Sequence, residues 1–386
     1  MLQIDVAIFG GGIAGLWLGN LLSSKGYSCV VLESEGLGGQ QSLLSQGIIH
    51  GGLKYALGGT LSSESEAIAG MPDRWRQCLQ GNGDVDLRGV KVLSDTQHLW
   101  SAGSMASRVT TFFASRMRRG RIRKLKSADH PSALADRAFR GQVYQLDDLV
   151  VDTESLIARL ANSLEGQLLR FQPERDSIHW NEDGVDTIEI GELTLKPGMT
   201  VFAAGMGNRA LLQQAHQHDL ALDIHEQARP LHMVMVRHTL GHRLYAHCVG
   251  TSNKPRLTIT THDLPDGSLV WYLGGDVAER GVEQDPEVLI EQARQELRDL
   301  LPWIDFSQAN FATVRISRAE PRQDSLIKPD NAYAELRNNL VVTWPTKLTL
   351  APDLGDRVLA LLEDSGFKPE GKQPPLPADA PVPPLA

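Results

Sequence analysis

The sequence predicts a two-domain α/β protein: a Rossmann-like dinucleotide-binding domain of the glutathione-reductase type, joined to a second domain with a mixed or antiparallel sheet. Two observations lead to this fold class. Residues 4–33 contain, in this order, an apolar strand, a glycine-rich turn, a helix and a second apolar strand. This is the setting in which a dinucleotide-binding turn forms. Residues 225–315 change to longer alternating runs with a turn signal at Asp266-Gly267, which is typical of antiparallel strands.

The first turn is a glycine-rich run directly after the first strand: Gly10, Gly11, Gly12, Ile13, Ala14 and Gly15. Gly10 permits a tight turn, Gly12 lets the backbone approach a pyrophosphate, and Gly15 brings helix and strand together. The helix predicted over 14–22 offers free N–H groups to the anion. Glu33 follows about 20 residues later, where its carboxylate can accept hydrogen bonds from a ribose. These residues predict a dinucleotide cofactor.

Length and composition exclude several classes of protein. A chain of 386 residues is too long for one compact core. The net charge of −9 argues against general nucleic-acid binding. Three cysteines without a CxxC pair argue against a disulfide framework. No secretory signal and no apolar run of about 18 residues is visible, so we expect a cytoplasmic protein, or one peripheral on the inner face of the membrane.

A second glycine-rich stretch covers residues 36–59, in which eight of 24 residues are glycine. It contains Ile49 and His50 within the run Ile-His-Gly-Gly-Leu-Lys-Tyr. A flexible surface loop is the simple interpretation of so much glycine. An apolar pair and a histidine between glycines favour the floor of a pocket instead.

The glycine-rich turn, Glu33 and the Ile-His-Gly-Gly-Leu-Lys-Tyr run together resemble the FAD-dependent oxidoreductases of the D-amino-acid oxidase superfamily. The run itself is most similar to glycerol-3-phosphate dehydrogenases and their 2-hydroxyglutarate-oxidising relatives. The preceding Ser45-Gln46-Gly47 is closer to the hydroxy-acid branch. A strand near 199–203 that ends on Ala204-Gly205 resembles the superfamily's third cofactor-contacting element, and its distance from the first turn favours FAD over NAD.

The resemblance implies that FAD is the cofactor and that a defined set of residues binds it. These are Gly10, Gly12, Ile13, Ala14, Gly15, Glu33, Ser34, Gln41, Ser42, Gly47, Ile49, Ala204, Gly205, Lys347, Leu348 and Thr349.

The resemblance also supplies candidates for catalysis. Arg318 is the nearest match to an arginine that enters the active site in the superfamily, with Arg322 as the alternative register. Lys347 begins a Lys-Leu-Thr run like that of the glycerol-3-phosphate enzymes, where two glycines stand in place of Pro345-Thr346. We expect Arg318 and Lys347 to bind a small anionic organic substrate. His50 is the expected base or polariser, because imidazole ordinarily titrates near pH 6.5.

With a single dinucleotide motif, the flavin must take its hydride from the substrate and pass electrons to oxygen, a quinone or a carrier protein. The expected reaction is oxidation of CH–OH in a 2-hydroxy acid or polyol phosphate by hydride transfer to flavin N5. One alternative is oxidation of the CH–NH bond of an amino acid, which the same fold supports. Another is a flavin-bound, non-catalytic protein associated with RNA or a membrane.

The predicted FAD domain comprises 1–80, 145–220 and 316–365, and the substrate domain comprises 81–144 and 221–315. A basic helical segment is expected near 104–126, with aromatic side chains and dense positive charge over 112–126. We favour a solvated helix end there, with contact to anionic lipid as the alternative. Residues 366–386 carry seven prolines and are expected to form an extended tail. Eight histidines between 216 and 262 lack ligand spacing, so no metal is expected.

Overall fold

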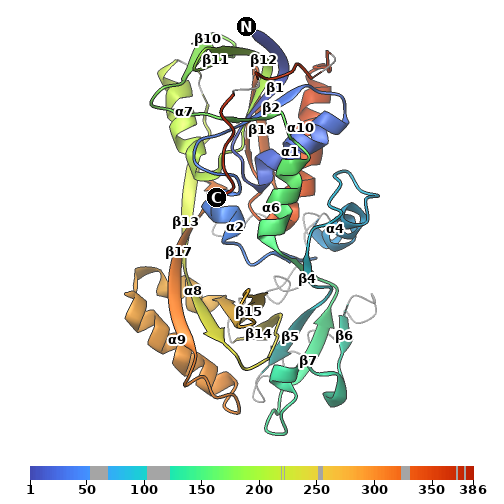
Figure 1. Cartoon of the computed structure of the whole chain (residues 1–386), viewed down its shortest axis with the longest axis vertical. Helices are drawn as coiled ribbons and strands as arrows, with labels where there is room; N and C mark the ends of the chain where they lie inside the picture. Colours follow the sequence, from blue (N-terminus) through green and yellow to red (C-terminus); the bar gives the residue numbers. More distant parts are fainter. Residues whose placement is uncertain are drawn as a thin grey trace.

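The computed structural model describes residues 1–52, 68–101, 122–218, 220, 222–250, 255–322, 331–370, 373–377 and 380–386. Two lobes lie one above the other, and two long strands, β13 and β17, run from the lower lobe toward the upper one (Figure 1). The C-terminal segment crosses the upper lobe and ends near α2 (Figure 1).

The upper lobe is built on an eight-stranded sheet with the order β10-β11-β12-β1-β2-β9, in which β19 also pairs with β12 and β18 with β19. Its strands are β1 (Leu2–Phe9), β2 (Cys29–Glu33), β9 (Leu168–Arg170), β10 (Ser177–Asn181), β11 (Gly184–Ile190), β12 (Leu193–Phe202), β18 (Tyr333–Arg337) and β19 (Leu340–Trp344). The pairs β1–β12, β1–β2, β2–β9 and β12–β19 are parallel. The dinucleotide-binding fold class is therefore confirmed.

Helices cover this sheet because its central strands are apolar on both faces, as in other parallel sheets. They are α1 (Ile13–Ser24), α6 (Thr153–Asn162), α7 (Asn208–Gln217) and α10 (Ala351–Asp364). Trp17 of α1 is fully buried against β1 and β2 in the main core. Asp152 caps the N-terminus of α6, because its Oδ1 accepts a hydrogen bond from Ser155 N at 2.8 Å.

The lower lobe is built on a second eight-stranded sheet with the order β17-β13-β16-β15-β14-β5-β7-β6. Its strands are β5 (Gln97–Ser101), β6 (Ile122–Lys124), β7 (Gln142–Leu146), β13 (Glu226–His238), β14 (Ala246–Val249), β15 (Pro255–Asp263), β16 (Leu269–Gly274) and β17 (Asn310–Pro321). Helix α9 (Pro286–Leu300) packs its apolar side against one face, next to the short helix α8 (Asp276–Arg280). The pair β14–β5 is parallel and the others are antiparallel, so the expected mixed sheet is confirmed.

A small sheet of β3 (Ile48–Ile49), β8 (Leu149–Val151) and β4 (Val92–Ser94) connects the lobes, together with α2 (Gly39–Leu43) and α4 (Met71–Leu79). The remaining short elements are 3₁₀ turns: η4 (Ser127–Asp129), η5 (Ser132–Leu134), η6 (Gly205–Gly207), η7 (Gly281–Glu283) and η8 (Leu348–Leu350).

Two sequence expectations differ from the structure. The predicted return to the FAD domain at residue 316 falls inside β17, which pairs with β13 in the second sheet as far as Pro321. The basic segment is not helical where it is described: Ile122–Lys124 form β6, and Arg123 donates to Gln145 Oε1 across the β6–β7 pair. Residues 102–121 lie outside the described part of the chain.

Candidate active site

Two glycines of the first turn are required by close backbone packing. Gly10 has a φ of +113°, and a Cβ on it would lie 2.5 Å from the carbonyl oxygen of Ala203 at the end of β12. A Cβ on Gly15 would lie 1.8 Å from the carbonyl oxygen of Gly10. The turn therefore closes between the ends of β1 and β12 and the first turn of α1, as the sequence predicts.

Gly12 is different, because its surroundings are open. Among the described residues, a Cβ built on it has one neighbour within 4 Å, Ser42 Oγ at 3.2 Å. That hydroxyl accepts a hydrogen bond from Ile13 N at 3.0 Å, so Ser42 holds the start of α1 beside the open side of the turn. Open space at a helix N-terminus fits a pyrophosphate group. Ala14, the next residue of α1, is buried in the same turn.

The carboxylate of Glu33 is tied to the glycine-rich turn. Its Oε2 accepts from Gly11 N at 2.6 Å, and its Oε1 accepts from Glu35 N at 2.8 Å. Ser34, between the two carboxylates, is exposed. Glu33 thus lies at the mouth of the turn, where a ribose hydroxyl could replace one of the backbone donors.

The end of β12 forms the opposite wall of the turn. Ala204 N donates to Asn208 Oδ1 at 2.9 Å, and Asn208 Nδ2 donates to the carbonyl oxygen of Thr343 at 3.0 Å. Gly205 has a φ of +58°, and its carbonyl oxygen accepts from Trp344 Nε1 at 3.3 Å. These contacts fix the small residues of this strand end beside β19.

His50 lies at the end of β3 and is buried. Gly52 N donates to its Nδ1 at 3.2 Å, and Gly51 N donates to Asp148 Oδ1 at 2.9 Å. Because Nδ1 accepts this bond, the proton of the neutral imidazole belongs on Nε2. His50 is therefore arranged as a hydrogen-bond donor. Leu53, Lys54 and Tyr55 of the same run lie outside the described residues.

Residues 345–349 meet His50 from the other side. Thr349 Oγ1 donates to the carbonyl oxygen of His50 at 3.2 Å, and Leu348 packs against the main core. Thr346 has a φ of +60°, the left-handed conformation that glycine adopts easily and that β-branched residues rarely adopt. Residue 346 therefore has a backbone conformation that a glycine would adopt without strain. Lys347 is half-buried two residues before Thr349.

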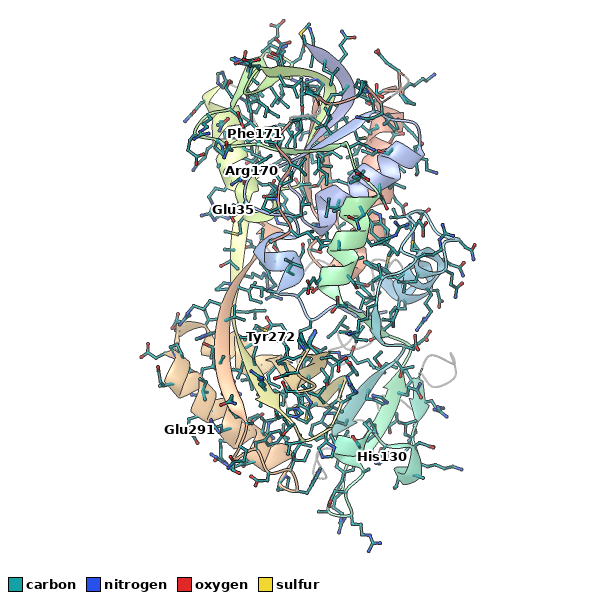
Figure 2. All side chains as sticks on the ribbon, viewed as in Figure 1. Glu35, His130, Arg170, Phe171, Tyr272 and Glu291 are labelled. Carbon is teal, nitrogen blue, oxygen red and sulfur yellow. The ribbon has the colours of Figure 1, made fainter. Side chains whose placement is uncertain are left out.

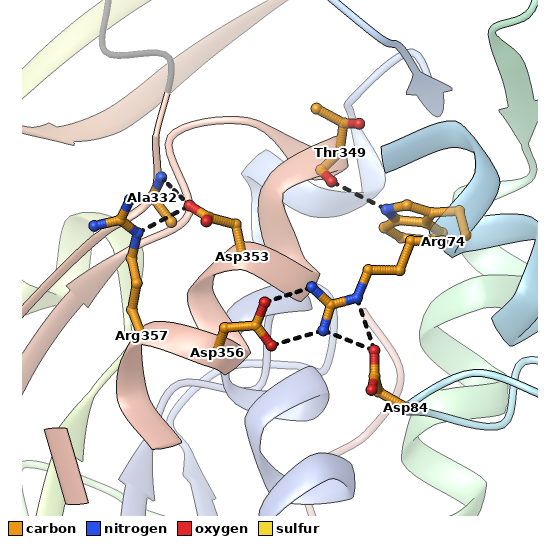
Figure 3. Close-up of polar contacts among 8 residues, drawn as sticks. Arg74, Asp84, Ala332, Thr349, Asp353, Asp356 and Arg357 are labelled. Carbon is orange, nitrogen blue, oxygen red and sulfur yellow. Dashed lines mark hydrogen bonds and ion pairs between the residues drawn. The ribbon is translucent and has the colours of Figure 1, made fainter. Parts of the chain in front are cut away.

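Helix α4 contacts residues 345–349 through Trp75. Trp75 Nε1 donates to the carbonyl oxygen of Thr349 at 3.0 Å. Arg74 bridges Asp84 at 2.7 Å and Asp356 of α10 at 2.5 Å (Figure 3). These ion pairs raise the pKa of the Arg74 guanidinium, against the opposing effect of burial. Helices α4 and α10 are therefore linked by an ion pair beside the segment that contacts His50.

Arg318 lies near the end of β17. Its Nε is buried and has no hydrogen-bond partner among the residues that the structure describes. Its neighbours are fixed: Ala319 N donates to Gln41 Oε1 at 3.0 Å, and Glu320 pairs with Arg229 at 2.5 Å. Arg322, the alternative register, has an exposed side chain and donates its backbone N–H to His225. The geometry therefore favours Arg318 as the arginine of the site.

Residues 39–50 connect these parts. Gln41 contacts β17, Ser42 contacts the first turn, and Ile49 and His50 lead to Thr349. A Cβ on Gly47 would lie 2.0 Å from the carbonyl oxygen of Val151, so glycine here allows β3 to pack against β8.

Sequence reasoning missed Gln46 and Asp148 as residues of the site. Gln46 Nε2 donates to the carbonyl oxygen of Tyr272 at 2.9 Å, and Tyr272 OH donates to the carbonyl oxygen of Leu44 at 2.9 Å. Figure 2 shows Tyr272 on the side of the lower lobe that faces the upper one. Burial raises the pKa of the Tyr272 hydroxyl. Each of these contacts joins residues more than 90 positions apart in the sequence, so no local sequence pattern predicts them.

The histidines that suggested a metal have other partners. His232 Nδ1 lies 3.0 Å from the carbonyl oxygen of Gly281, His247 Nδ1 lies 2.9 Å from Thr258 Oγ1, and His238 packs on aromatic rings. Within the described ranges, no three His, Cys, Asp or Glu side chains form a group that could hold a metal ion. No helix in that same part of the chain is long and apolar enough to cross a membrane.

The glycine-rich turn on a parallel sheet, joined to a second sheet whose strand β17 carries Arg318, fits the class of FAD-dependent oxidoreductases. The family model of FAD-dependent oxidoreductases named DAO matches residues 5–341, and the chain belongs to this family. It is 49% identical to a probable FAD-dependent oxidoreductase of Pseudomonas aeruginosa, PA4991, over 100% of this chain and 97% of that protein.

Solved structures agree with this assignment. The crystal structure of PA4991 from Pseudomonas aeruginosa matches with a TM-score of 0.85 and 45% identity, covering 100% of this chain and 96% of that one. Glycine oxidase from Bacillus cereus matches with a TM-score of 0.67 and 16% identity, covering 94% and 95% of the two chains. L-α-glycerophosphate oxidase from Mycoplasma pneumoniae, solved with FAD bound, gives 0.64 and 16%, with coverage of 98% and 100%. The protein is therefore an FAD-dependent oxidoreductase.

Proposed function

We propose that this oxidoreductase oxidises a small organic anion at the carbon that bears its hydroxyl group. The first candidate substrates are a 2-hydroxy acid and a polyol phosphate. The observation that carries the proposal is the buried Nε of Arg318, for which the described part of the chain offers no hydrogen-bond acceptor. A buried donor without a partner is costly, and a guanidinium suits carboxylate and phosphate groups through paired N–H donors. A substrate anion would supply the missing acceptor.

The cofactor and the protein divide the chemistry between them. FAD, when bound, accepts the hydride that leaves the substrate carbon. Gly12, Ser42 and Glu33 are the residues that would hold its phosphates and ribose. Arg318 orients the anionic group, and the Nε2–H of His50 donates a hydrogen bond to a substrate or flavin oxygen. Lys347 adds positive charge to the same wall.

An amino acid is the second candidate substrate, and the His50 geometry favours it. An alcohol must lose its hydroxyl proton as hydride departs, which requires a base. His50 Nδ1 accepts a bond from Gly52 N, so this nitrogen is occupied in the described arrangement. An amine substrate that arrives neutral needs no such base. The similarity in fold to glycine oxidase agrees with this candidate but does not select it.

Anaerobic flavin reduction tests the proposal. Purified holoenzyme is mixed with matched 2-hydroxy acids, polyol phosphates and amino acids, and the loss of flavin absorbance is recorded. Arg318→Lys should raise the substrate concentration for half-maximal reduction by about tenfold to a hundredfold, since a bidentate contact is lost. Arg322→Lys is the matched control and should behave as wild type. Bleaching by amino acids alone would move the assignment to the second candidate, and an unaltered Arg318→Lys variant would remove the anion anchor.

The electron acceptor (oxygen, a quinone or a carrier protein) and a peripheral membrane contact through residues 112–126 are further proposals. The positive charge over 112–126 supports the membrane contact. Liposome sedimentation should then show binding that requires anionic lipid and disappears at high salt, because the contact is electrostatic. Equal sedimentation with neutral liposomes would show that residues 112–126 do not bind anionic lipid and would favour a solvated surface for them.

A further inference from the structure

The described end of the proline-rich tail is paired with the FAD domain. Leu37 N donates to the carbonyl oxygen of Pro384 at 2.8 Å, and Ala386 N donates to the carbonyl oxygen of Leu37 at 3.1 Å. Leu37 and Leu385 form a parallel β-bridge. Residues 380–386 are thus held by backbone hydrogen bonds rather than by loose contact.

Leu37 is also part of the support of the glycine-rich turn. A Cβ on Gly11 would lie 2.7 Å from Leu37 Cδ2, and Gly38 N donates to the carbonyl oxygen of Gly11 at 2.8 Å. Gly11 N in turn donates to Glu33. The tail therefore contacts the residue that packs directly against the turn and the ribose-binding carboxylate.

The other end of the same segment reaches the neighbouring strand. Arg170 N, at the end of β9, donates to the carbonyl oxygen of Pro381 at 2.6 Å, and Phe171 N donates to the carbonyl oxygen of Glu33 at 2.9 Å. Arg170 and Phe171 are labelled beside one another in Figure 2, on the upper lobe with Glu35. The tail thus crosses the carboxyl ends of β2 and β9, the edge of a parallel sheet at which nucleotides bind.

We propose that residues 381–386 form the outer wall of the adenosine half of the FAD site and retain the cofactor there. Two side chains have surfaces suited to this role. Leu385 is 57% exposed beside the bridge, an apolar surface that an adenine ring could cover. Arg170 Nε is buried and has no hydrogen-bond partner within the described ranges, which suits a donor to a nucleotide. The proposal rests on FAD binding and not on which substrate is oxidised.

FAD retention by the holoenzyme tests this proposal. Removal of residues 381–386 should speed FAD release, followed by the rise in flavin fluorescence after dilution, by about tenfold, the equivalent of one or two ordinary contacts. ADP binding to the apoprotein should weaken by a similar factor, because ADP carries only the adenosine half. Leu385→Ala should show a smaller change in the same direction. Leu240→Ala is the matched control, since Leu240 is also an exposed leucine but lies just after β13, outside the tail.

A second variant separates this role from a purely stabilising one. A Cβ on Gly36 would lie 3.0 Å from the Cβ of Ala386, so Gly36→Val should displace the tail while keeping its sequence. The thermal midpoint of each apoprotein is measured beside FAD release. Faster release and weaker ADP binding at an unchanged midpoint support the proposal. Unchanged release with a lowered midpoint, or tighter ADP binding after truncation, would overturn it, the latter because the tail would then compete with the nucleotide.

Discussion

The hydroxyl of Thr349 donates a hydrogen bond to the main-chain carbonyl of His50 at 3.2 Å, across 299 residues of sequence. The carbonyl of Thr349 in turn accepts from the Trp75 indole at 3.0 Å. Trp75 packs on Trp17 of α1, with ring centroids 5.1 Å apart. The position of His50 therefore depends on the segment after β19 and on the helix that begins with the dinucleotide-binding turn.

Thr349→Val should slow substrate reduction of the flavin by roughly fivefold, the equivalent of about 1 kcal/mol for one hydrogen bond. FAD content should remain normal, because the change acts on the backbone of His50 and leaves the turn intact. Thr349→Ser keeps the hydroxyl and serves as the control. Stopped-flow reduction at matched FAD occupancy measures both variants, and equal rates for valine and serine would show that this bond does not position His50.

Replacement of His50 itself separates a donor from a base. His50→Ala should leave FAD bound and slow flavin reduction by about 10²–10⁴-fold, the usual loss for a group that moves or polarises a proton. His50→Gln retains an N–H donor, so it should recover part of the rate if His50 donates a hydrogen bond. Loss as complete as in His50→Ala would instead support a base. A rate of flavin reduction within a few-fold of the wild-type rate in both variants would mean that His50 contributes packing alone.

Local patterns in the sequence were sufficient for the first strand–turn–helix–strand unit, because its apolar runs, its glycines and Glu33 follow one another within 30 residues. The glycine at position 15 is dictated by the carbonyl of Gly10 in the same turn. The cap at Asp152 is local in the same way, because the acceptor and the donor are three residues apart.

The parts that sequence reasoning misplaced depend on partners far along the chain. Arg318 was assigned to the first domain, yet β17 continues in the second sheet because its whole length pairs with β13, from Asn310 to Pro321. The left-handed Thr346 could not be predicted either, since threonine is a poor signal for that conformation. Its hydroxyl donates to the carbonyl of Asn331 at 3.1 Å, a contact that only the folded chain creates.

Gly12→Val should give folded protein that lacks FAD. The valine side chain would occupy the open side of the turn, where the protein atom nearest to its Cβ is Ser42 Oγ at 3.2 Å, so the fold tolerates it while a pyrophosphate does not. Gly15→Ala is the contrasting variant: its Cβ would lie 1.8 Å from the Gly10 carbonyl, and it should lower thermal stability. Flavin absorbance and circular dichroism distinguish the two, and full FAD content in Gly12→Val would contradict the assignment of the turn.

His238 should make the stability of the protein fall in mild acid. Burial lowers the pKa of its imidazole to about 4, with a smaller contribution from His242, because the ring packs against Trp271 and Phe306. In the unfolded chain an imidazole titrates near pH 6.5. Between these values the unfolded state binds more protons, so the free energy of unfolding is highest above pH 6.5 and declines as the pH falls toward 4.

His238→Leu should therefore make the free energy of unfolding depend less on pH between 4 and 6.5. Above pH 6.5, the variant should differ from the wild type only through the packing of its side chain. His98 and His262 also have lowered pKa values through burial, so part of the decline should remain. His225→Leu, at a largely exposed position, is the matched control and should keep the wild-type profile. Urea unfolding of each variant from pH 4.5 to 7.5 provides the measurement. A decline as steep in His238→Leu as in the wild type would mean that His238 is protonated, and accommodated, in the folded protein.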